Sequence, residues 1–420
     1  MKKLLGLILG LALIAAACTK GGPSPIVVGA IYPLSGPQGS AGTEEFDGVL
    51  LAAQMANQAG GVDGHPIQIR SLDVAGAEAA TAAVEDLHAA GIGLVIGSYG
   101  STISAPAATA TAARGMLFWE TGAVGMLPAT ASRGDLTFRV PPTGATLGRT
   151  AIDFVTRELA PKLHRDPQSL RFAVSFVDDV YGRSVGGGAL DEMKALGLRN
   201  VGTFGYDAQT ADMNAVARRI ARARPDVLFV SAYLADGIAM RRALVSQHVP
   251  LLVNIGTSSS YCMPAFGRAL GRDAVGVFAS DKPSGWSLDG AGLSTSAAAL
   301  LKQANEAYER AHGDYMSAAA LAGFSGAWAL FTHVLPASSG PTPQAVAAAA
   351  RVANLPAGSL PNGSGLRFGA PGTTMAGDNV EASSVIWEWV APRTEAIVWP
   401  PSLATHPIRR VSVDPWNTEA

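Results

Sequence analysis

The stretch Ile26–Tyr32, with the sequence IVVGAIY, is an apolar run rich in β-branched residues, which is typical of a buried strand. Residues 33–42 read as a loop rich in Pro and Gly, and residues 44–59 then place apolar side chains at helical spacing. A strand, a loop and a helix in this order make one α/β unit. The fold class depends on whether this unit repeats.

The unit recurs along the whole chain. Runs that are apolar at consecutive positions, such as Val227–Val230, suit parallel strands that helices cover on both faces. The further predicted strands and helices are 67–74 followed by 77–90, 93–96 followed by 102–113, 116–119, 172–177 followed by 183–196, 227–231 followed by 235–247, 251–255, and two longer helices at 292–313 and 317–335. We therefore predict a doubly wound α/β protein with mostly parallel sheets, whose ligands bind outside the carboxyl ends of the strands.

The composition is that of a globular protein with a large core. The chain has 420 residues, of which 48% are hydrophobic and 15% charged, and this length suggests two or three domains. The formal net charge of -2 lacks the basic excess that binding to phosphates requires, so we expect no nucleic-acid partner. Two cysteines cannot form a disulfide framework.

The N-terminus has the pattern of a secretory signal peptide. Two lysines precede an apolar run over residues 4–17, which is too short for a membrane span of about 20 residues. Small residues that end at Cys18 resemble the bacterial lipoprotein signal, in which the cysteine is lipid-modified. We predict a signal peptide over 1–17, a lipid-anchored tether over 18–25, and an extracytoplasmic, membrane-anchored protein. The other cysteine, Cys262, then reads as a small buried residue.

No pattern for catalysis or metal binding stands out in the sequence. The seven histidines and two cysteines lack the spacing of a metal site. No Gly-x-Ser-x-Gly elbow follows a strand, and no P-loop occurs. The run Gly186–Gly188 lacks dinucleotide-binding spacing and instead predicts close helix packing. We expect a protein that is not an enzyme and that uses no cofactor.

A loop with the sequence GSYGST, residues 97–102, joins a predicted buried strand to a helix and is the best local candidate for a binding site. It contains Tyr99, Ser101 and Thr102. Ser101 can cap the helix while its hydroxyl and the following free amides face an anion. The loop is therefore either a cradle for a carboxylate or carbonyl group, or an ordinary helix cap.

Several segments together resemble the branched-chain amino-acid branch of the periplasmic binding proteins. Each is weak alone, but their order and spacing are specific, and the similarity runs from about residue 26 to residue 400. The segments are Ile26–Gly36, Asn57–Gly64, Ile67–Asp73, Gly97–Ala107, Tyr181-Gly182, Pro225–Val227 and Ile397–Pro400.

The resemblance implies a type I periplasmic binding fold: two α/β lobes with a ligand cleft between them and three hinge crossings. The crossings are expected near Arg139–Pro142, Asp281–Pro283 and Glu381–Ser384. The implied first lobe holds residues 26–140 and 283–381, and the implied second lobe holds 141–282 and 382–420.

The resemblance also implies a function. The chain would capture a small amino-acid-like, carboxylate or amide ligand and deliver it to an ABC transporter permease, which a separate ATPase energises. The lipid anchor would hold the chain at the membrane. A receptor of the same fold that signals to a membrane partner is the alternative, and an enzyme is a more distant one, for which turnover of the ligand would be the signature.

On the side of the ligand carboxylate, the sequence agrees with the family. The resemblance places Ser101 as the serine that holds the carboxylate, and Tyr181 and Tyr233 as two tyrosines from the second lobe. The loop that offers backbone groups and a threonine in the family is Gly122-Ala123-Val124 here. The backbone is kept at this loop, and the hydroxyl is lost.

On the ammonium side, the sequence departs from the family. The acidic residue that would pair with the α-ammonium falls on Thr257, and an aromatic lining residue falls on Ala41. A buried, unpaired ammonium costs several kcal/mol. We therefore expect a carboxylate or amide with a bulkier or more aromatic body, held between Tyr99, Trp119 and the two tyrosines of the second lobe. Glu120 either takes over the ammonium or is a carboxylate at the rim of the cleft.

Overall fold

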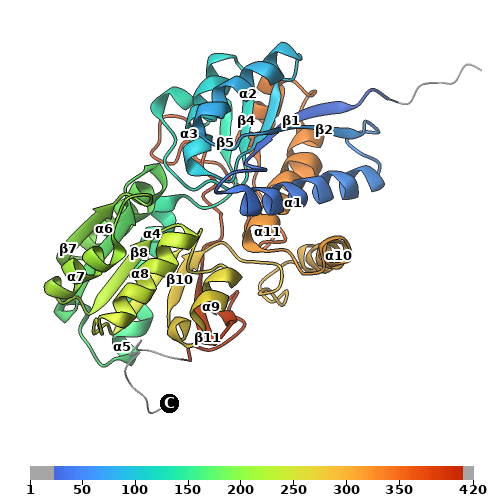
Figure 1. Cartoon of the computed structure of the whole chain (residues 1–420). Helices are drawn as coiled ribbons and strands as arrows, with labels where there is room; N and C mark the ends of the chain where they lie inside the picture. The colour runs from blue at the N-terminus through green and yellow to red at the C-terminus, as the bar shows by residue number, and fades with distance from the viewer. Residues whose placement is uncertain (1–22, 410–420) are drawn as a thin grey trace, which may run out of the picture.

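The computed structural model describes residues 23–409, which form two α/β lobes, each built on its own sheet (Figure 1). The first lobe has a sheet of five strands in the order β2-β1-β3-β4-β5, all of them parallel. Its strands are β1 (Ile26–Tyr32), β2 (Ile67–Asp73), β3 (Leu94–Gly97), β4 (Leu117–Glu120) and β5 (Thr137–Arg139).

The second lobe has a sheet of seven strands in the order β12-β11-β10-β9-β8-β6-β7. Its strands are β6 (Arg171–Val177), β7 (Arg199–Tyr206), β8 (Val227–Ser231), β9 (Val253–Thr257), β10 (Phe278–Asp281), β11 (Val385–Ala391) and β12 (Thr394–Trp399). The strands β7, β6, β8, β9 and β10 are parallel to one another, whereas β11 and β12 form an antiparallel edge. The predicted fold class, with two lobes and mostly parallel sheets, is confirmed.

Helices cover both sheets, as the apolar runs in the strands require. Every residue of β3 and of β8 is buried. The helices of the first lobe are α1 (Gly39–Gln58), α2 (Ala77–Ala89), α3 (Ser101–Ala113), α10 (Thr295–His312), α11 (Ala318–Ala329), α12 (Leu335–Ala337) and α13 (Pro343–Val352). Those of the second lobe are α4 (Gly144–Phe154), α5 (Ala160–Lys162), α6 (Val180–Ala195), α7 (Met213–Ala223), α8 (Leu234–Ser246) and α9 (Pro264–Leu270).

The loop expected over residues 33–42 is shorter than its composition indicates, because α1 begins at Gly39. Its small residues belong to the helix and let it approach the end of β1. A Cβ on Gly42 would lie 2.1 Å from the carbonyl oxygen of Pro33, so glycine serves packing here. The expectation of a loop up to residue 42 is therefore wrong.

The chain passes between the two sheets three times: from β5 to α4, from β10 to α10, and ahead of β11. The first and third passages are hydrogen-bonded to each other. The N–H of Arg139 donates to the carbonyl oxygen of Gly377 at 2.8 Å, and the N–H of Asn379 donates to that of Arg139 at 2.9 Å. The residue limits of the lobes and hinges given above stay predictions.

One helical stretch in the described chain, Ala318–Ala337, is long and apolar enough to span a membrane, but 72% of its apolar window is buried inside the protein. It packs against α1, and Trp119 of β4 donates its indole N–H to the carbonyl oxygen of Gly326 at 2.9 Å. These contacts make it a core helix.

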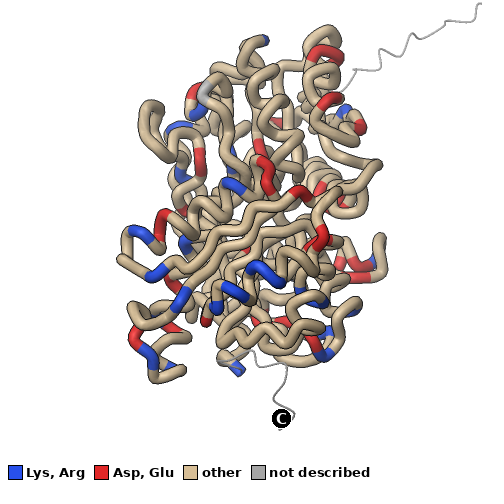
Figure 2. Tube along the Cα trace, turned by 60° about the vertical axis from the view of Figure 1, so that its left-hand side comes forward, with Lys and Arg blue, Asp and Glu red and all other residues tan. Residues whose placement is uncertain are grey.

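Charged residues of both signs are interspersed along the described trace (Figure 2).

Close packing at the glycine run of α6 is confirmed. A Cβ on Gly188 would lie 2.4 Å from Cα of Ala145 in α4, and a Cβ on Gly148 of α4 would lie 2.2 Å from the carbonyl oxygen of Val185 in α6. The two helices therefore meet backbone to backbone. In contrast, a Cβ on Gly187 would meet nothing within 4 Å.

This packing predicts opposite effects for two neighbouring substitutions. Gly188→Ala should lower the free energy of unfolding by about 1–3 kcal/mol, because the added methyl group overpacks the contact between α4 and α6. Gly187→Ala, the matched control, should leave stability unchanged or raise it by roughly 0.5–1 kcal/mol, since alanine loses less backbone entropy in a helix. Urea denaturation of both variants measures the difference. Equal stabilities would contradict the packing.

Candidate functional site

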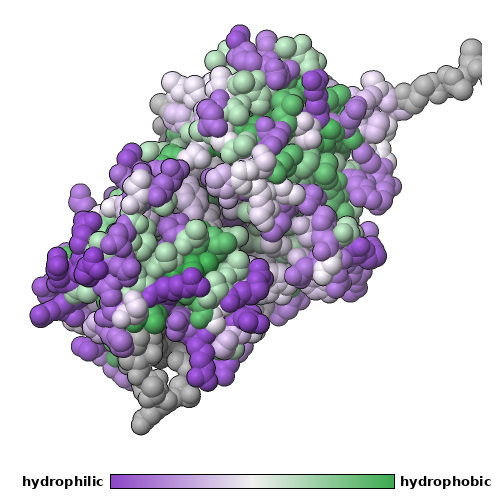
Figure 3. Space-filling model, in the orientation of Figure 1, coloured by the Kyte–Doolittle hydropathy of each residue, from purple (hydrophilic) through white to green (hydrophobic). Residues whose placement is uncertain are grey.

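A small cavity lies between the lobes at the carboxyl ends of the strands, with a volume of about 20 Å³. In the space-filling view, pale residues of weak polarity gather where the lobes meet (Figure 3). The cavity is reached by the loops after β1, β3 and β4 in the first lobe, by α6 and the loops after β8 and β9 in the second, and by the residue after β10. The lining residues are Gln38, Tyr99, Gly100, Ser101, Gly122, Val124, Tyr181, Tyr233, Ser258, Ser259 and Lys282.

Ser101 is the first residue of α3 and lies at the cavity, but it does not cap the helix. The N-cap is Gly100, which has no side chain to cap with, so the expectation of a Ser101 cap is wrong. The Ser101 hydroxyl instead accepts the N–H of Gly125 at 2.9 Å. Among the described residues no acceptor is found for its hydroxyl proton, which leaves that proton able to donate to a ligand. Thr102, the next residue of the helix, does not line the cavity.

Glu120, at the end of β4, is fully buried and is a structural carboxylate. It accepts the N–H groups of Ser98, Gly122 and Ala123, each at 2.8 Å. It also accepts the hydroxyls of Ser98, at 3.1 Å, and of Ser104. The interpretation as a rim carboxylate is wrong. These five donors leave no oxygen for a ligand ammonium, and Glu120 does not line the cavity.

Several polar backbone groups of the loop after β4 form hydrogen bonds inside the protein. The amides of Gly122 and Ala123 bind Glu120, and the carbonyl oxygen of Val124 accepts a guanidinium N–H of Arg139 at 2.9 Å. Gly122 and Val124 therefore line the cavity with these particular groups already bound inside the protein, and the expectation that the loop offers backbone groups to a ligand stays a prediction. Ala123 is buried behind them.

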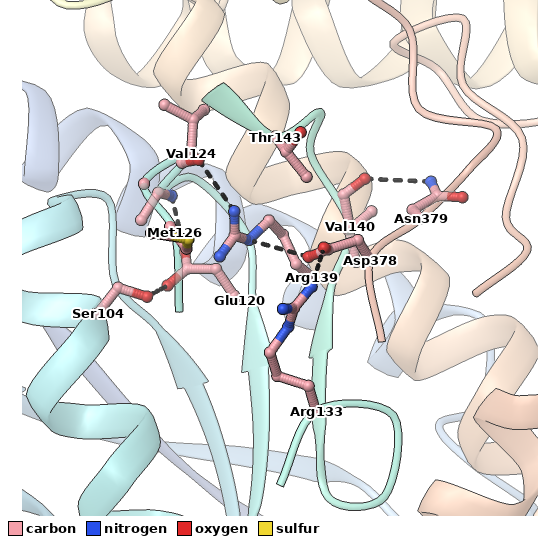
Figure 4. A network of polar contacts seen from close by, with 12 residues as sticks. Ser104, Glu120, Val124, Met126, Arg133, Arg139, Val140, Thr143, Asp378 and Asn379 are labelled. Atoms are coloured by element: carbon pink, nitrogen blue, oxygen red, sulfur yellow. Dashed lines mark hydrogen bonds and ion pairs between the residues drawn. The ribbon is translucent and has the colours of Figure 1, made fainter. Parts of the chain in front are cut away.

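A buried polar network connects this loop to the hinge passages (Figure 4). Arg139 lies 3.5 Å from the carboxylate of Asp378, which also pairs with Arg133 at 2.7 Å. Asn379 donates its side-chain N–H to the carbonyl oxygen of Val140 at 3.1 Å. Arg139 is only 2% exposed, so its charge has to be paired, and the pairing fixes the cleft loop relative to the hinge.

Thr257, at the position where the family has an acidic residue, points away from the cavity. It is fully buried, and its hydroxyl donates to the carbonyl oxygen of Ser280 at 2.9 Å. It therefore joins β9 to β10. Ala41 lies in the first turns of α1 and is buried. Neither residue lines the cavity.

Tyr181 and Tyr233 form an aromatic wall on the second lobe. Their ring centroids are 5.2 Å apart with an interplanar angle of 33°. The Tyr181 hydroxyl donates to the carbonyl oxygen of Ser258, and the Tyr233 hydroxyl donates to the carboxylate of Asp179 at 2.7 Å. Burial raises the pKa of both phenols, so they stay neutral. The hydroxyls therefore form hydrogen bonds within the second lobe, and the rings face the cavity.

Tyr99 and Ser259 face the cavity from opposite lobes. Both residues line the cavity, Tyr99 from the loop after β3 and Ser259 from the loop after β9. Both residues have left-handed backbones, with φ of 64° and 70°, which non-glycine residues rarely adopt and which cluster at binding sites. Tyr99 is thus a cavity residue, as the sequence analysis expected.

Lys282 and Gln38 are cavity residues that the sequence analysis missed. Lys282 follows β10 and is 6% exposed, and its ammonium group donates to the carbonyl oxygen of Gly122 at 3.0 Å. The side-chain oxygen of Gln38 is buried without a partner in the described chain. A signal for Lys282 was present, because it lies within the expected crossing Asp281–Pro283, where a lysine between lobes can reach the cleft.

The surroundings of Glu120 predict a stability effect. Glu120→Gln should lower the free energy of unfolding by about 1–3 kcal/mol, since the new amide group turns a donor toward backbone N–H groups and leaves them unsatisfied. Glu309→Gln on the exposed side of α10 is the control and should change little. Chemical denaturation of both variants provides the measurement. A Glu120→Gln protein as stable as wild type would rule out the structural role.

Comparisons with known proteins identify the family. The family model described as periplasmic binding protein matches residues 25–380. The Leu/Ile/Val-binding protein homolog 8 of Brucella suis biovar 1 (strain 1330) is 29% identical over 371 residues, which cover 87% of this chain and 89% of that protein.

Solved structures agree on the fold. A leucine-binding protein from Thermotoga maritima MSB8 superposes with a TM-score of 0.71 at 15% identity, and covers 88% of this chain and 97% of its own. A branched-chain amino acid transporter substrate-binding protein from Streptococcus pneumoniae, in complex with isoleucine, has a TM-score of 0.69 at 16% identity, and covers 90% of this chain and 100% of its own.

These matches confirm the resemblance seen in the sequence. The model match spans most of the chain, including the strands and loops that bring residues to the cavity. The family consists of extracytoplasmic binding proteins, so the expectation of a protein that is not an enzyme is confirmed. On the match to residues 25–380, this chain belongs to the periplasmic binding protein family.

Proposed function

We propose that the chain is a solute-binding lipoprotein that captures a small amino-acid-like, carboxylate or amide ligand between its lobes and delivers it to an ABC transporter permease. Its family membership supports a role in binding. The curated relative bears a Leu/Ile/Val-binding name, and one neighbour of the same fold holds isoleucine. These similarities support a ligand about the size of an amino acid.

The observation that carries the proposal is a cavity lined from both lobes. Ser101 brings a hydroxyl with a free proton from the first lobe, and Tyr181 and Tyr233 bring aromatic faces from the second. A ligand that contacts both sides binds the closed arrangement better than the open one, and so shifts the population toward it. Closure then provides the signal that a transport partner can recognise.

The proposed anchor is Cys18, which lies outside the described residues, as does the whole predicted signal peptide. The first strand begins at Ile26. Residues 18–25 are therefore proposed as the tether between the lipid and the first lobe. This part of the proposal rests on the sequence pattern alone.

Ligand binding and closure can be tested together. Mass spectrometry of small molecules released on unfolding identifies what the purified protein carries, and small-angle scattering should show a more compact particle when this compound is added back. Ser101→Ala should weaken its binding by about 1–3 kcal/mol, the value for a hydrogen bond to a charged group. Ser132→Ala, in a surface turn outside the cavity, is the control. Unchanged affinity of Ser101→Ala would remove Ser101 from the site.

The anchor has a separate test. Cys18→Ser should move the folded protein from the detergent phase to the aqueous phase in a phase-partitioning assay, because it removes the only proposed acylation site. Thr19→Ser, next to it in the sequence, should partition as wild type does. If Cys18→Ser stays in the detergent phase, the chain is not a lipoprotein anchored through this residue.

A further inference from the structure

The lining of the cavity has an unusual balance of charge for a site that would hold an amino acid. A zwitterion needs an anionic partner for its ammonium group, because a buried charge without a partner is costly. Among the lining residues in the described chain there is no aspartate or glutamate, and Lys282 is the one basic side chain. The cavity therefore offers a cation and no anion.

Lys282 is held so that its charge stays at the cavity. Its side chain is buried, and one ammonium proton is donated to the carbonyl oxygen of Gly122. No carboxylate of the described chain lies within ion-pair distance of it, since it takes part in none of the salt bridges found there. The remaining ammonium protons are available to an acceptor in the cavity.

Two acidic residues behind the cavity, Glu45 and Asp281, are close enough to Lys282 to attract its charge, and each keeps one carboxyl oxygen without a hydrogen-bond partner in the described chain. Glu45 accepts the Thr121 hydroxyl at 2.7 Å, and burial raises the pKa of its carboxyl to about 8, so it is mostly neutral at pH 7. Asp281 accepts the thiol of Cys262, and burial raises the pKa of its carboxyl too. Glu120 has the donors described above. None of these groups reaches the cavity lining to meet a ligand cation.

Lys282 and Ser101 act on the same loop. Lys282 binds the carbonyl oxygen of Gly122, and the hydroxyl of Ser101 binds the amide of Gly125, three residues further along. Both are thus fixed on the first-lobe wall with donor protons to spare. The amide group of Gln38, whose oxygen has no partner, can present either its oxygen or its nitrogen to the same space.

We infer that the cleft is built for an organic carboxylate anion without an ammonium group, whose charge Lys282 neutralises and whose carboxylate Ser101 also contacts. This inference rests on the proposed function and chooses among the ligand classes that it leaves open. The aromatic faces of Tyr181 and Tyr233 form the wall for the body of the ligand. Lys282 is then the residue that determines specificity for charge.

The first experiment uses the unmodified protein and matched sets of compounds with the same body. Each set contains a carboxylate, its α-amino acid and its primary amide: 4-methylpentanoate with leucine and 4-methylpentanamide, and 3-phenylpropanoate with phenylalanine and 3-phenylpropanamide. Calorimetric titration into protein freed of its ligand by unfolding and refolding should show the carboxylate binding at least about tenfold more tightly than the other two members, as expected for one charge-assisted contact.

The second experiment assigns this preference to Lys282. Lys282→Met keeps the length of the side chain without its charge and should bring the carboxylate and the amide to within about threefold of each other. Lys282→Arg should keep the preference for the anion. Lys302→Met, on the exposed surface of α10, is the matched control and should behave as wild type does. If Lys282→Met does not fold, the comparison of compounds on the unmodified protein still decides the question.

The outcomes separate the inference from the proposed function. Tighter binding of leucine or phenylalanine than of the matching carboxylate would overturn the inference while supporting a solute-binding protein. Equal binding of carboxylate and amide would do the same. Absence of binding by every compound, together with no small molecule released from the purified protein, would overturn both.

Discussion

The buried carboxylate of Glu120 is the interaction on which the cleft depends. A carboxylate removed from water is stable only when donors surround it, and the donors here come from two stretches of the chain, one over residues 98–104 and one directly after Glu120. Ser98 belongs to the loop after β3, Gly122 to the loop after β4, and Ser104 to α3. The Glu120 side chain thus holds together the loops after β3 and β4 and the first turn of α3, which line the cavity from the first lobe. The start of α3 with Ser101 and the amide of Gly125 meet only because these segments are held together in this way.

The same wall is also tied to the hinge. Arg139, at the end of the strand that leads out of the first lobe, binds the carbonyl oxygen of Val124 and pairs with Asp378 in the returning passage. The loop after β4 is therefore fixed from two sides, by Glu120 and by Arg139. When the lobes move relative to each other, this wall can stay unchanged. The tyrosines and Ser258 then approach from the other side as one surface.

The sequence predicted what depends on local pattern, and missed what depends on distant partners. The strand at Ile26–Tyr32 has the predicted bounds, because apolar β-branched runs are legible locally. Ser101, Tyr181 and Tyr233 reach one cavity because parallel strands place their loops at one edge, as the resemblance implied. Glu120 was misread, since its donors are set by the tertiary fold. Lys282 was missed for the same reason, because its partner Gly122 is 160 residues away. No strands were predicted where β11 and β12 lie, although the segment Ile397–Pro400, which carried the resemblance, overlaps β12.

The glycine contact between α4 and α6 makes these two helices a single rigid block. The first helix follows directly from the passage out of the first lobe, and the second begins with Val180 and Tyr181. A rotation at the hinge that moves α4 therefore moves α6, and Tyr181 with it, by the same rotation. A fluorescent dye on the outer face of α6, for instance at the exposed Asp191, would report movement of the whole lobe rather than of one helix. Side chains around the cleft can change when a new ligand is selected. The glycines between α4 and α6 cannot, because any larger residue would collide with the backbone of the facing helix.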